Sequence, residues 1–247
     1  KIFDMKYCKK CLYPDTKPLL EFNEEGVCSA CFNLKLKNEI DWEKKDQEFR
    51  EILDKFKNKD GSNYDCIIPV SGGKDSTFQT YVMKKVYGLN PLVVNFHPLD
   101  QTEVGRKNLE NLKKIGVDCI EFSPDPNVYL KLAKFGLTEL GDFQWPEHIG
   151  IFTVPVQIAV RYKIPLIIWG ENSALEYGQG HFSDFNTNSV LDKEYLEKNG
   201  GDFLDKITPH DMTKYGFDIK DLKPYLYPSD EEINQIGVTG IFLGSYI

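Results

Sequence analysis

Residues 70–77 read VSGGKDST and directly follow the apolar run YDCIIP. Adjacent glycines let a backbone approach an anion closely, and a helix that starts there directs N–H groups and a positive dipole end toward it. Hydroxyl groups add donors, a lysine adds positive charge, and an aspartate can hold a magnesium ion or orient the turn. We therefore expect a phosphate or pyrophosphate to bind at seven consecutive residues, Ser71, Gly72, Gly73, Lys74, Asp75, Ser76 and Thr77.

The spacing in this turn excludes two common nucleotide-binding motifs. A Walker P-loop requires GxxxxGKS or GxxxxGKT, and a dinucleotide-binding turn requires GxGxxG; residues 70–77 fit neither. They resemble SGGxDS, the signature of the PP-loop ATP pyrophosphatases, whose five fixed residues recur by chance roughly once per million positions. The resemblance implies an enzyme that splits ATP between its α and β phosphates and transfers AMP to a carbonyl or amide oxygen.

Four of the six cysteines form two CxxC pairs, Cys8 with Cys11 and Cys28 with Cys31. Each pair lets two thiolates converge on one ion, and two pairs complete a tetrahedron. We predict a structural zinc ribbon folded by its metal, because so short a segment has little core and four protein ligands leave no open position for catalysis. Iron remains an alternative to zinc, and disulfides are disfavoured in a reducing cytosol.

Apolar segments alternate with helical patterns from residue 64 onward, which predicts an α/β fold with a doubly wound parallel sheet and helices on both faces. We expect three regions: a zinc ribbon at 1–38, an amphipathic linker helix at 39–62, and a PP-loop domain at 63–247 whose C-terminal part is incomplete. Loops and helices at 171–230 would then cover the ligand-binding edge of the sheet. The expected strands are 64–70, 91–96, 118–123 and 165–170, and the expected helices are 76–87, 102–115, 126–138 and 151–162, with a loop around Trp145 and Pro146.

Composition narrows the class of protein further. The 247-residue chain has a net charge of −8, which argues against a nucleic-acid-coating or membrane-surface protein but leaves a local basic groove open. No run of about 18 apolar residues predicts a transmembrane helix, and the N-terminus lacks the apolar core of a signal peptide. We expect a cytoplasmic enzyme that neither enters membranes nor binds nucleic acid, trimmed at both ends relative to the full gene product.

Five stretches resemble the bacterial N-acetyl sugar amidotransferases: YCKKCLYPDTKP, FNEEGVCSAC, DCIIPVSGGKDST, HIGIFTVPVQIAVRYKIPLIIWGEN and YPSDEEINQIGVTGIFLGSYI. That resemblance implies an ATP-dependent enzyme of O-antigen, lipopolysaccharide or flagellar sugar synthesis, with ATP, Zn²⁺ and Mg²⁺ as cofactors. It would adenylate the N-acetyl oxygen of a sugar, which we expect to be nucleotide-activated, and ammonia would displace AMP to give an acetamidino group.

The resemblance also implies roles for individual residues. The adenine would lie near the end of the second strand, beside Asn95, Phe96 and His97. Lys74, Asp75 and Glu171 would be catalytic, with Asp75 as a magnesium ligand. Glu171 follows the fourth expected strand and would be a magnesium ligand or an acid that orients ammonia. Sugar-facing loops would contribute Trp145, His148, Asn172 and Tyr177, together with His181 and Asp184, although surface or packing roles explain each of these singly as well.

The source of ammonia is the remaining question. A glutaminase site needs a nucleophilic cysteine at the N-terminus or on a strand–helix elbow. The four paired cysteines are assigned to metal, and Cys66 and Cys119 lie within apolar strands, where a buried core thiol is the simpler interpretation. We therefore expect a separate glutaminase subunit as partner, as the family resemblance also implies.

Two other functions remain open at this stage. A tRNA thiolase of the PP-loop family can also combine zinc knuckles with this loop, but it generally needs reactive cysteines and a basic surface. A nucleotide sensor or assembly subunit would keep ATP binding without turnover.

Overall fold

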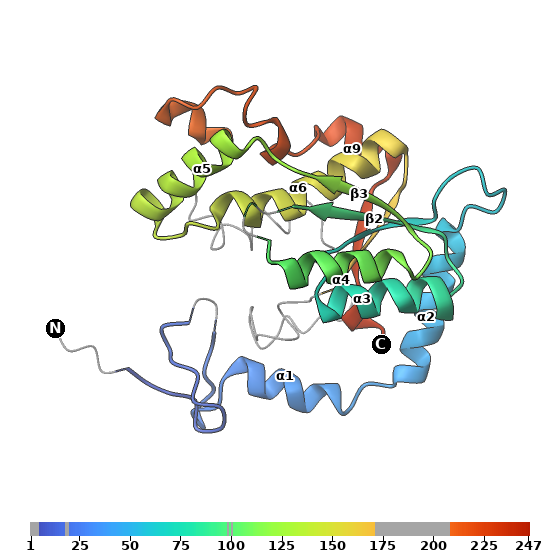
Figure 1. Ribbon diagram of the computed structural model, residues 1–247. Coiled ribbons are helices and arrows are strands. Elements are labelled where there is room, and N and C mark those ends of the chain that lie inside the picture. The colour runs from blue at the N-terminus through green and yellow to red at the C-terminus, as the bar shows by residue number, and fades with distance from the viewer. Residues whose placement is uncertain (1–4, 18–19, 98, 100, 171–207) are drawn as a thin grey trace. The chain divides into compact units, whose positions relative to one another are not determined.

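The computed structural model describes residues 5–17, 20–97, 99, 101–170 and 208–247 (Figure 1). These residues fall into two compact units. The first contains the described residues of Lys1–Ile52 and Gly170–Ser189 together with Phe242–Ile247, and the second contains Leu53–Trp169 with the described residues of Val190–Ile241. Within the described residues, no helix is both long enough and apolar enough to cross a membrane.

The sheet carries the architecture that the alternating pattern predicts. Its described strands run in the order β3-β2-β1-β4-β5, and β1 pairs in parallel with both β2 and β4, while β2 pairs in parallel with β3. The order reverses at β1, so the chain winds first to one side and then to the other, and the predicted doubly wound fold is confirmed. The strands are β1 (Cys66–Pro69), β2 (Pro91–Phe96), β3 (Asp118–Phe122), β4 (Leu166–Trp169) and β5 (Thr239–Phe242).

Helices cover both faces of this sheet. Figure 1 shows α3 and α4 on one face and α6 on the other, with α5 beside α6. Residues Val93, Ile67 and Ile168 of the central strands are fully buried, as expected for strands covered on both faces. The helices of these layers are α3 (Lys74–Tyr81), α4 (Glu103–Lys113), α5 (Pro126–Phe135) and α6 (Trp145–Tyr162), and π-helical turns at Val82–Val86 and Gly136–Leu140 extend α3 and α5.

The expected loop around Trp145 and Pro146 is wrong, because α6 begins there and not at residue 151. Proline is tolerated in the first turn of a helix, where its missing N–H would have no intrahelical acceptor. The Trp145 side chain is fully buried and serves as a core residue at the start of the helix. Pro155 lies inside α6, as the predicted helix requires.

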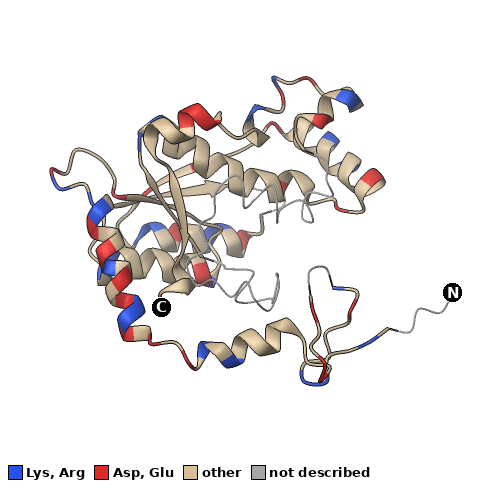
Figure 2. Cartoon of the chain, turned by 180° about the vertical axis from the view of Figure 1, so that it is seen from behind, with Lys and Arg blue, Asp and Glu red and all other residues tan. Residues whose placement is uncertain are grey.

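The remaining described helices are short, apart from α2. The amphipathic helix expected between the ribbon and the sheet is present as α2 (Trp42–Phe56), which buries Phe49 and Leu53 and carries charges of both signs along its exposed surface (Figure 2). In the first unit, the Phe49 ring stacks on Tyr246 with centroids 4.9 Å apart. The others are α1 (Ser29–Lys37), α9 (Asp230–Ile236) and 3-10 helices at Asp211–Tyr215, Lys223–Tyr225 and Leu243–Ser245.

Candidate phosphate loop and four-cysteine site

The glycine turn connects β1 to α3 at the carboxyl edge of the sheet, next to the point where the strand order reverses. Folds of this kind bind ligands at that switch point. Gly72 has a φ of +80°, and a Cβ atom added there would lie 3.2 Å from both the Gly105 carbonyl oxygen and the Leu109 nitrogen of α4. The turn therefore needs glycine at 72 for two reasons, the left-handed backbone and the close approach of a second helix.

Hydroxyl groups within the turn hold its shape. Ser71 N–H donates to Ser76 Oγ at 3.4 Å, and Gly73 N–H donates to Ser71 Oγ at 3.3 Å. Ser76 Oγ and Thr77 Oγ1 both donate to the Gly73 carbonyl oxygen, at 3.2 and 2.9 Å. These hydroxyls thus orient the backbone of the turn, and N–H groups of the first turn of α3 provide donors that point out of the helix end.

Lys74 and Asp75 form an ion pair at the start of α3. Lys74 Nζ lies 2.6 and 2.7 Å from the two carboxylate oxygens of Asp75. The side chains are 88% and 60% exposed, so solvent screens the pair and it contributes little to stability. Both groups can therefore exchange this contact for a phosphate oxygen or a cation at small energetic cost.

Two buried amides connect the turn to neighbouring strands. Asn95, at the end of β2, donates from Nδ2 to the Val70 carbonyl oxygen at 2.7 Å, which fixes the last residue before the glycine turn. Gln79 of α3 donates from Nε2 to the Ile168 carbonyl oxygen of β4 at 2.6 Å. The structure thus brings the predicted residue Asn95 to the loop. Its role there is to position backbone, and its buried Oδ1 has no hydrogen-bond partner among the described residues.

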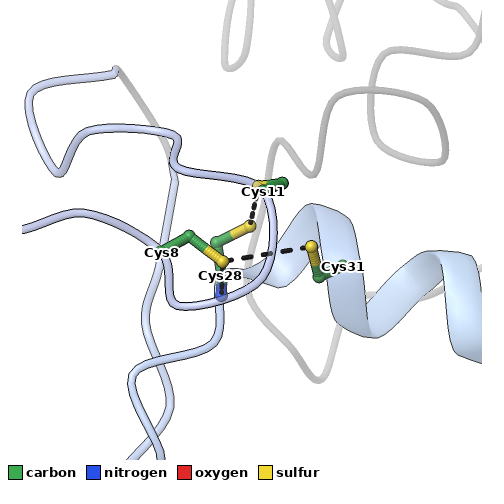
Figure 3. Close-up of side chains that lie close together, drawn as sticks. All are labelled: Cys8, Cys11, Cys28 and Cys31. Atoms are coloured by element: carbon green, nitrogen blue, oxygen red, sulfur yellow. Dashed lines mark hydrogen bonds between the residues drawn. The ribbon is translucent and has the colours of Figure 1, made fainter.

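The four predicted metal-binding cysteines converge in the first unit (Figure 3). Their sulfur atoms all lie within 4.8 Å of one another, with Cys8 Sγ 3.9 Å from Cys31 Sγ and Cys11 Sγ 3.5 Å from Cys28 Sγ. A tetrahedral ion with metal–sulfur bonds of about 2.3 Å would separate its sulfur ligands by about 3.8 Å. The arrangement therefore fits a four-cysteine metal site, and all six cysteines of the chain are free of disulfide bonds.

Backbone N–H groups around the site favour thiolates at selected positions. Lys10 N–H and Cys28 N–H lie 3.4 and 3.3 Å from Cys8 Sγ. Burial raises the pKa of Cys8, but the N–H groups of Cys11, Cys28 and Lys10 outweigh burial and lower the pKa to about 6. Burial raises the pKa of Cys28 and Cys31, so these thiols need a cation to be held as thiolates.

Three other predicted site residues lie on or against α6. His148 lies in the first turns of α6, with Nδ1 3.1 Å from Asp142 Oδ2, while Trp145 is buried in the core. Phe96 packs on α6, because a Cβ atom at Gly150 would meet its ring at 2.4 Å. Glu171, Asn172, Tyr177, His181 and Asp184 lie outside the described residues.

Sequence reasoning missed three residues that shape this region: Gln79, Asp142 and Gly105. The partners of Gln79 and Gly105 are distant in sequence, so no local pattern marks them. Asp142 lies six residues before His148 and just ahead of the start of a helix. An acidic residue at such a place could have been predicted to interact with the first turns of the helix.

Comparison with known proteins gives distant relatives. No protein-family model matches the chain. An uncharacterized protein from Methanocaldococcus jannaschii is 33% identical over 105 residues, which are 42% of this chain and 36% of that protein. The chain thus matches about a third of that relative's length.

Several solved structures are also similar. They include NMN synthetase from Francisella tularensis, at 17% identity and a TM-score of 0.42 over 80% of this chain and 93% of that one. The NH3-dependent NAD synthetase from Campylobacter jejuni has 16% identity and a TM-score of 0.44 over 80% and 92%. A predicted subunit of a tRNA methyltransferase from Methanocaldococcus jannaschii has 16% identity and a TM-score of 0.30 over 71% and 96%. None of these likenesses assigns an activity to this chain.

Proposed function

We propose that this protein is an ATP-dependent amidotransferase that converts the N-acetyl group of a bacterial surface-glycan sugar into an acetamidino group. The observation that carries the proposal is the SGGKDS turn, which lies between a buried parallel strand and a helix at the switch point of a doubly wound sheet. The sugar as acceptor rests on the sequence resemblance over five stretches of the chain.

The proposed reaction has two steps. The acetamide oxygen attacks the α-phosphorus of ATP, and pyrophosphate leaves. Ammonia then attacks the activated carbon, AMP leaves with the former acetamide oxygen, and loss of a proton gives the amidine. Adenylation is needed because an acetamide oxygen is a poor leaving group.

The residues of the turn would act on the departing pyrophosphate. N–H groups at the start of α3 would donate to its oxygens, and Lys74 would neutralise charge that develops there. Asp75, with Glu171 as a further proposed ligand, would hold a magnesium ion, which when bound stabilises the charge of the phosphates. Asn95 would keep the turn in place through its hydrogen bond to Val70.

The four-cysteine site would be structural, with zinc as the proposed metal. Four thiolates complete a tetrahedron and leave no position for substrate. We also propose that the enzyme is cytoplasmic and that it receives ammonia from a separate glutaminase subunit. The second proposal rests on the two remaining cysteines, because Cys66 is fully buried and burial also raises the pKa of Cys119 to about 11. A catalytic cysteine needs an accessible thiolate.

The test is turnover by the purified chain with ATP, magnesium, ammonium and a panel of free and nucleotide-activated N-acetyl sugars. We expect release of AMP and pyrophosphate, and a product in which mass spectrometry shows oxygen replaced by NH. Ser76→Ala and Asp75→Ala should abolish release, while the exposed Asp60→Ala should not. Release that survives both loop substitutions would refute the assigned site, and robust turnover with glutamine in place of ammonium would refute the separate glutaminase.

A parallel reaction with added tRNA tests the thiolase alternative. Pyrophosphate release that depends on added tRNA and a sulfur donor, with no response to any sugar, would replace the sugar amidotransferase with that function. ATP binding without pyrophosphate release under all of these conditions would favour a nucleotide sensor.

A further inference from the structure

A cavity of about 290 Å³ opens where β3 leads into α5. Its apolar wall consists of Pro124, Val128, Pro224 and Tyr225. The wall is rigid on the Pro224 side, because Thr153 Oγ1 of α6 donates to the Pro224 carbonyl oxygen at 2.7 Å. Gln157 Nε2 of α6 also donates to the carbonyl oxygens of Lys223 and Leu226, at 2.8 and 2.7 Å. The cavity is therefore shaped by the fold before any ligand enters.

The rest of the lining is charged and balanced in sign: Asp125, Asp221, Lys220 and Lys223. Asp125 Oδ1 accepts from Asn127 N–H and caps α5, and Lys220 Nζ lies 3.1 Å from Asp218 Oδ2. Lys223 forms no ion pair with any described residue. Carboxylates that accept and ammonium groups that donate, without a net charge, suit a neutral ligand with several hydroxyl groups.

The Tyr225 hydroxyl is an independent indication of a ligand. Tyr225 is fully buried, and its hydroxyl has no hydrogen-bond partner among the described residues. Burial raises the pKa of this phenol, with smaller contributions from Tyr129 and from Asp125 on the cavity rim, so the group stays a neutral donor. Buried tyrosine hydroxyls usually find a partner, and Tyr225 is one of the residues that line this cavity.

The position of the cavity relates it to the phosphate loop. The rings of Tyr225 and Phe96 pack edge to face with centroids 6.3 Å apart, and Phe96 stacks on Phe122 with centroids 6.0 Å apart. Phe96 ends β2, directly after Asn95, which donates to the carbonyl oxygen of Val70, the last residue before the glycine turn. The cavity thus lies at the same carboxyl edge of the sheet, two strands away from β1, or about 10 Å at the usual strand spacing.

We propose that this cavity binds a sugar ring of the acceptor, with the C–H face of the ring on Val128 and Pro224 and its hydroxyls on Asp221, Asp125 and Lys223. An acetamide group that extends from a ring held here toward β1 would reach the edge where ATP is expected. The inference rests on the proposed function for its choice of a sugar acceptor, and on the cavity itself for the residues involved.

Binding is tested on the full chain by saturation-transfer NMR with three probes, N-acetylglucosamine, N-acetylgalactosamine and N-acetylmannosamine, and with adenosine as a competitor for the loop. We expect saturation of the ring protons of at least one sugar, unaffected by adenosine. Lys223→Glu and Asp221→Ala should weaken that binding about tenfold or more, the usual result of losing a hydrogen bond to a charged group. Tyr225→Phe should weaken it about threefold, and the exposed Lys214→Glu serves as the matched control.

The outcomes separate this inference from the proposed function. Ser76→Ala should stop pyrophosphate release and leave sugar binding intact. Sugar binding that depends on Lys223 without any pyrophosphate release would support the cavity and overturn the amidotransferase. Pyrophosphate release whose sugar KM is unchanged by Lys223→Glu and Asp221→Ala, or the absence of saturation transfer from all three probes, would overturn the cavity as the sugar site.

Discussion

The four-cysteine site and the phosphate loop are both built from short motifs, but different forces hold them in shape. Around the cysteines the buried cluster is small, with Cys8, Val27 and Cys28 at its centre and Leu20 and Phe22 packed against it. The phosphate loop instead lies between α4 and a strand whose first three residues are fully buried, and its hydrogen bonds are made within the protein. We therefore expect the first site to depend on a metal ion for its fold, whereas the second would depend on its fold to bind a ligand.

This difference leads to different responses to mutation. If the four cysteines hold a metal ion, as we propose, then removing one of them takes away an interaction that few other contacts can replace. Removing a loop residue changes one contact among many around a packed sheet, so the fold survives and the effect appears in binding. The predictions below run from the largest expected effect to the smallest.

Loss of metal should unfold the cysteine region while the sheet remains folded. We expect Cys28→Ser, or treatment with a strong chelator, to release one zinc ion per chain, because structural zinc sites contribute about 10 kcal/mol or more to folding. Metal content and hydrogen exchange are the measurements, with faster exchange in residues 5–38 and unchanged exchange in Cys66–Pro69. Cys119→Ser is the control, and full metal retention by Cys28→Ser would contradict a four-cysteine site.

Gly72→Ala should destabilise the chain more than Gly88→Ala. Both glycines have positive φ, +80° and +66°, but only the Cβ atom at 72 would contact backbone of α4. We expect the free energy of unfolding to fall by roughly 2–4 kcal/mol for Gly72→Ala and by roughly 1–2 kcal/mol for Gly88→Ala. Urea denaturation measures both values, and equal losses would show that crowding by α4 has no part in fixing the loop.

Asn95→Ala should lower the stability of the fold and loosen the phosphate loop. The Val70 carbonyl oxygen loses its 2.7 Å side-chain donor, which costs about 1–2 kcal/mol when the group stays buried. We also expect a higher KM for ATP with a smaller change in kcat. Asn111→Ala, at an exposed amide that accepts from Lys114, is the control. An unchanged KM would remove Asn95 from the positioning of the loop.

Tyr225→Phe should leave stability unchanged or raise it by up to about 1 kcal/mol, because the removed hydroxyl is buried without a partner among the described residues. Thermal unfolding in the absence of sugar is the measurement. A clear loss of stability would indicate that the hydroxyl already has a partner, and would weaken the argument for a ligand beside it.

The strands β1 to β4 were predictable because each is a short apolar run followed by a helical pattern or a glycine. The loop and the cysteine pairs were predictable because their chemistry depends on fixed local spacing. The start of α6 was not, since Gly141 and Pro146 favour a loop locally, whereas burial of Trp145 in the core favours the helix. Tertiary packing outweighed the local signal there.

The contacts that complete the site were also hidden from the sequence. Gln79 meets the carbonyl oxygen of a residue 89 positions away, and Tyr225 reaches Phe96 from the far end of the chain. The cavity wall depends on Thr153 holding Pro224, a pair separated by 71 residues. Such contacts have no local period or motif, so they become visible only when the strand order is known.

The approach of α4 to Gly72 has a consequence for the thermodynamics of nucleotide binding. Backbone atoms at Gly105 and Leu109 already confine the turn, so its conformational entropy is lost during folding. That loss would therefore not reduce the free energy of nucleotide binding. Association should therefore proceed without a slow ordering phase. Substitutions on α4 that never touch the nucleotide should lower its affinity by loosening the turn, and calorimetry would detect them as a more unfavourable binding entropy.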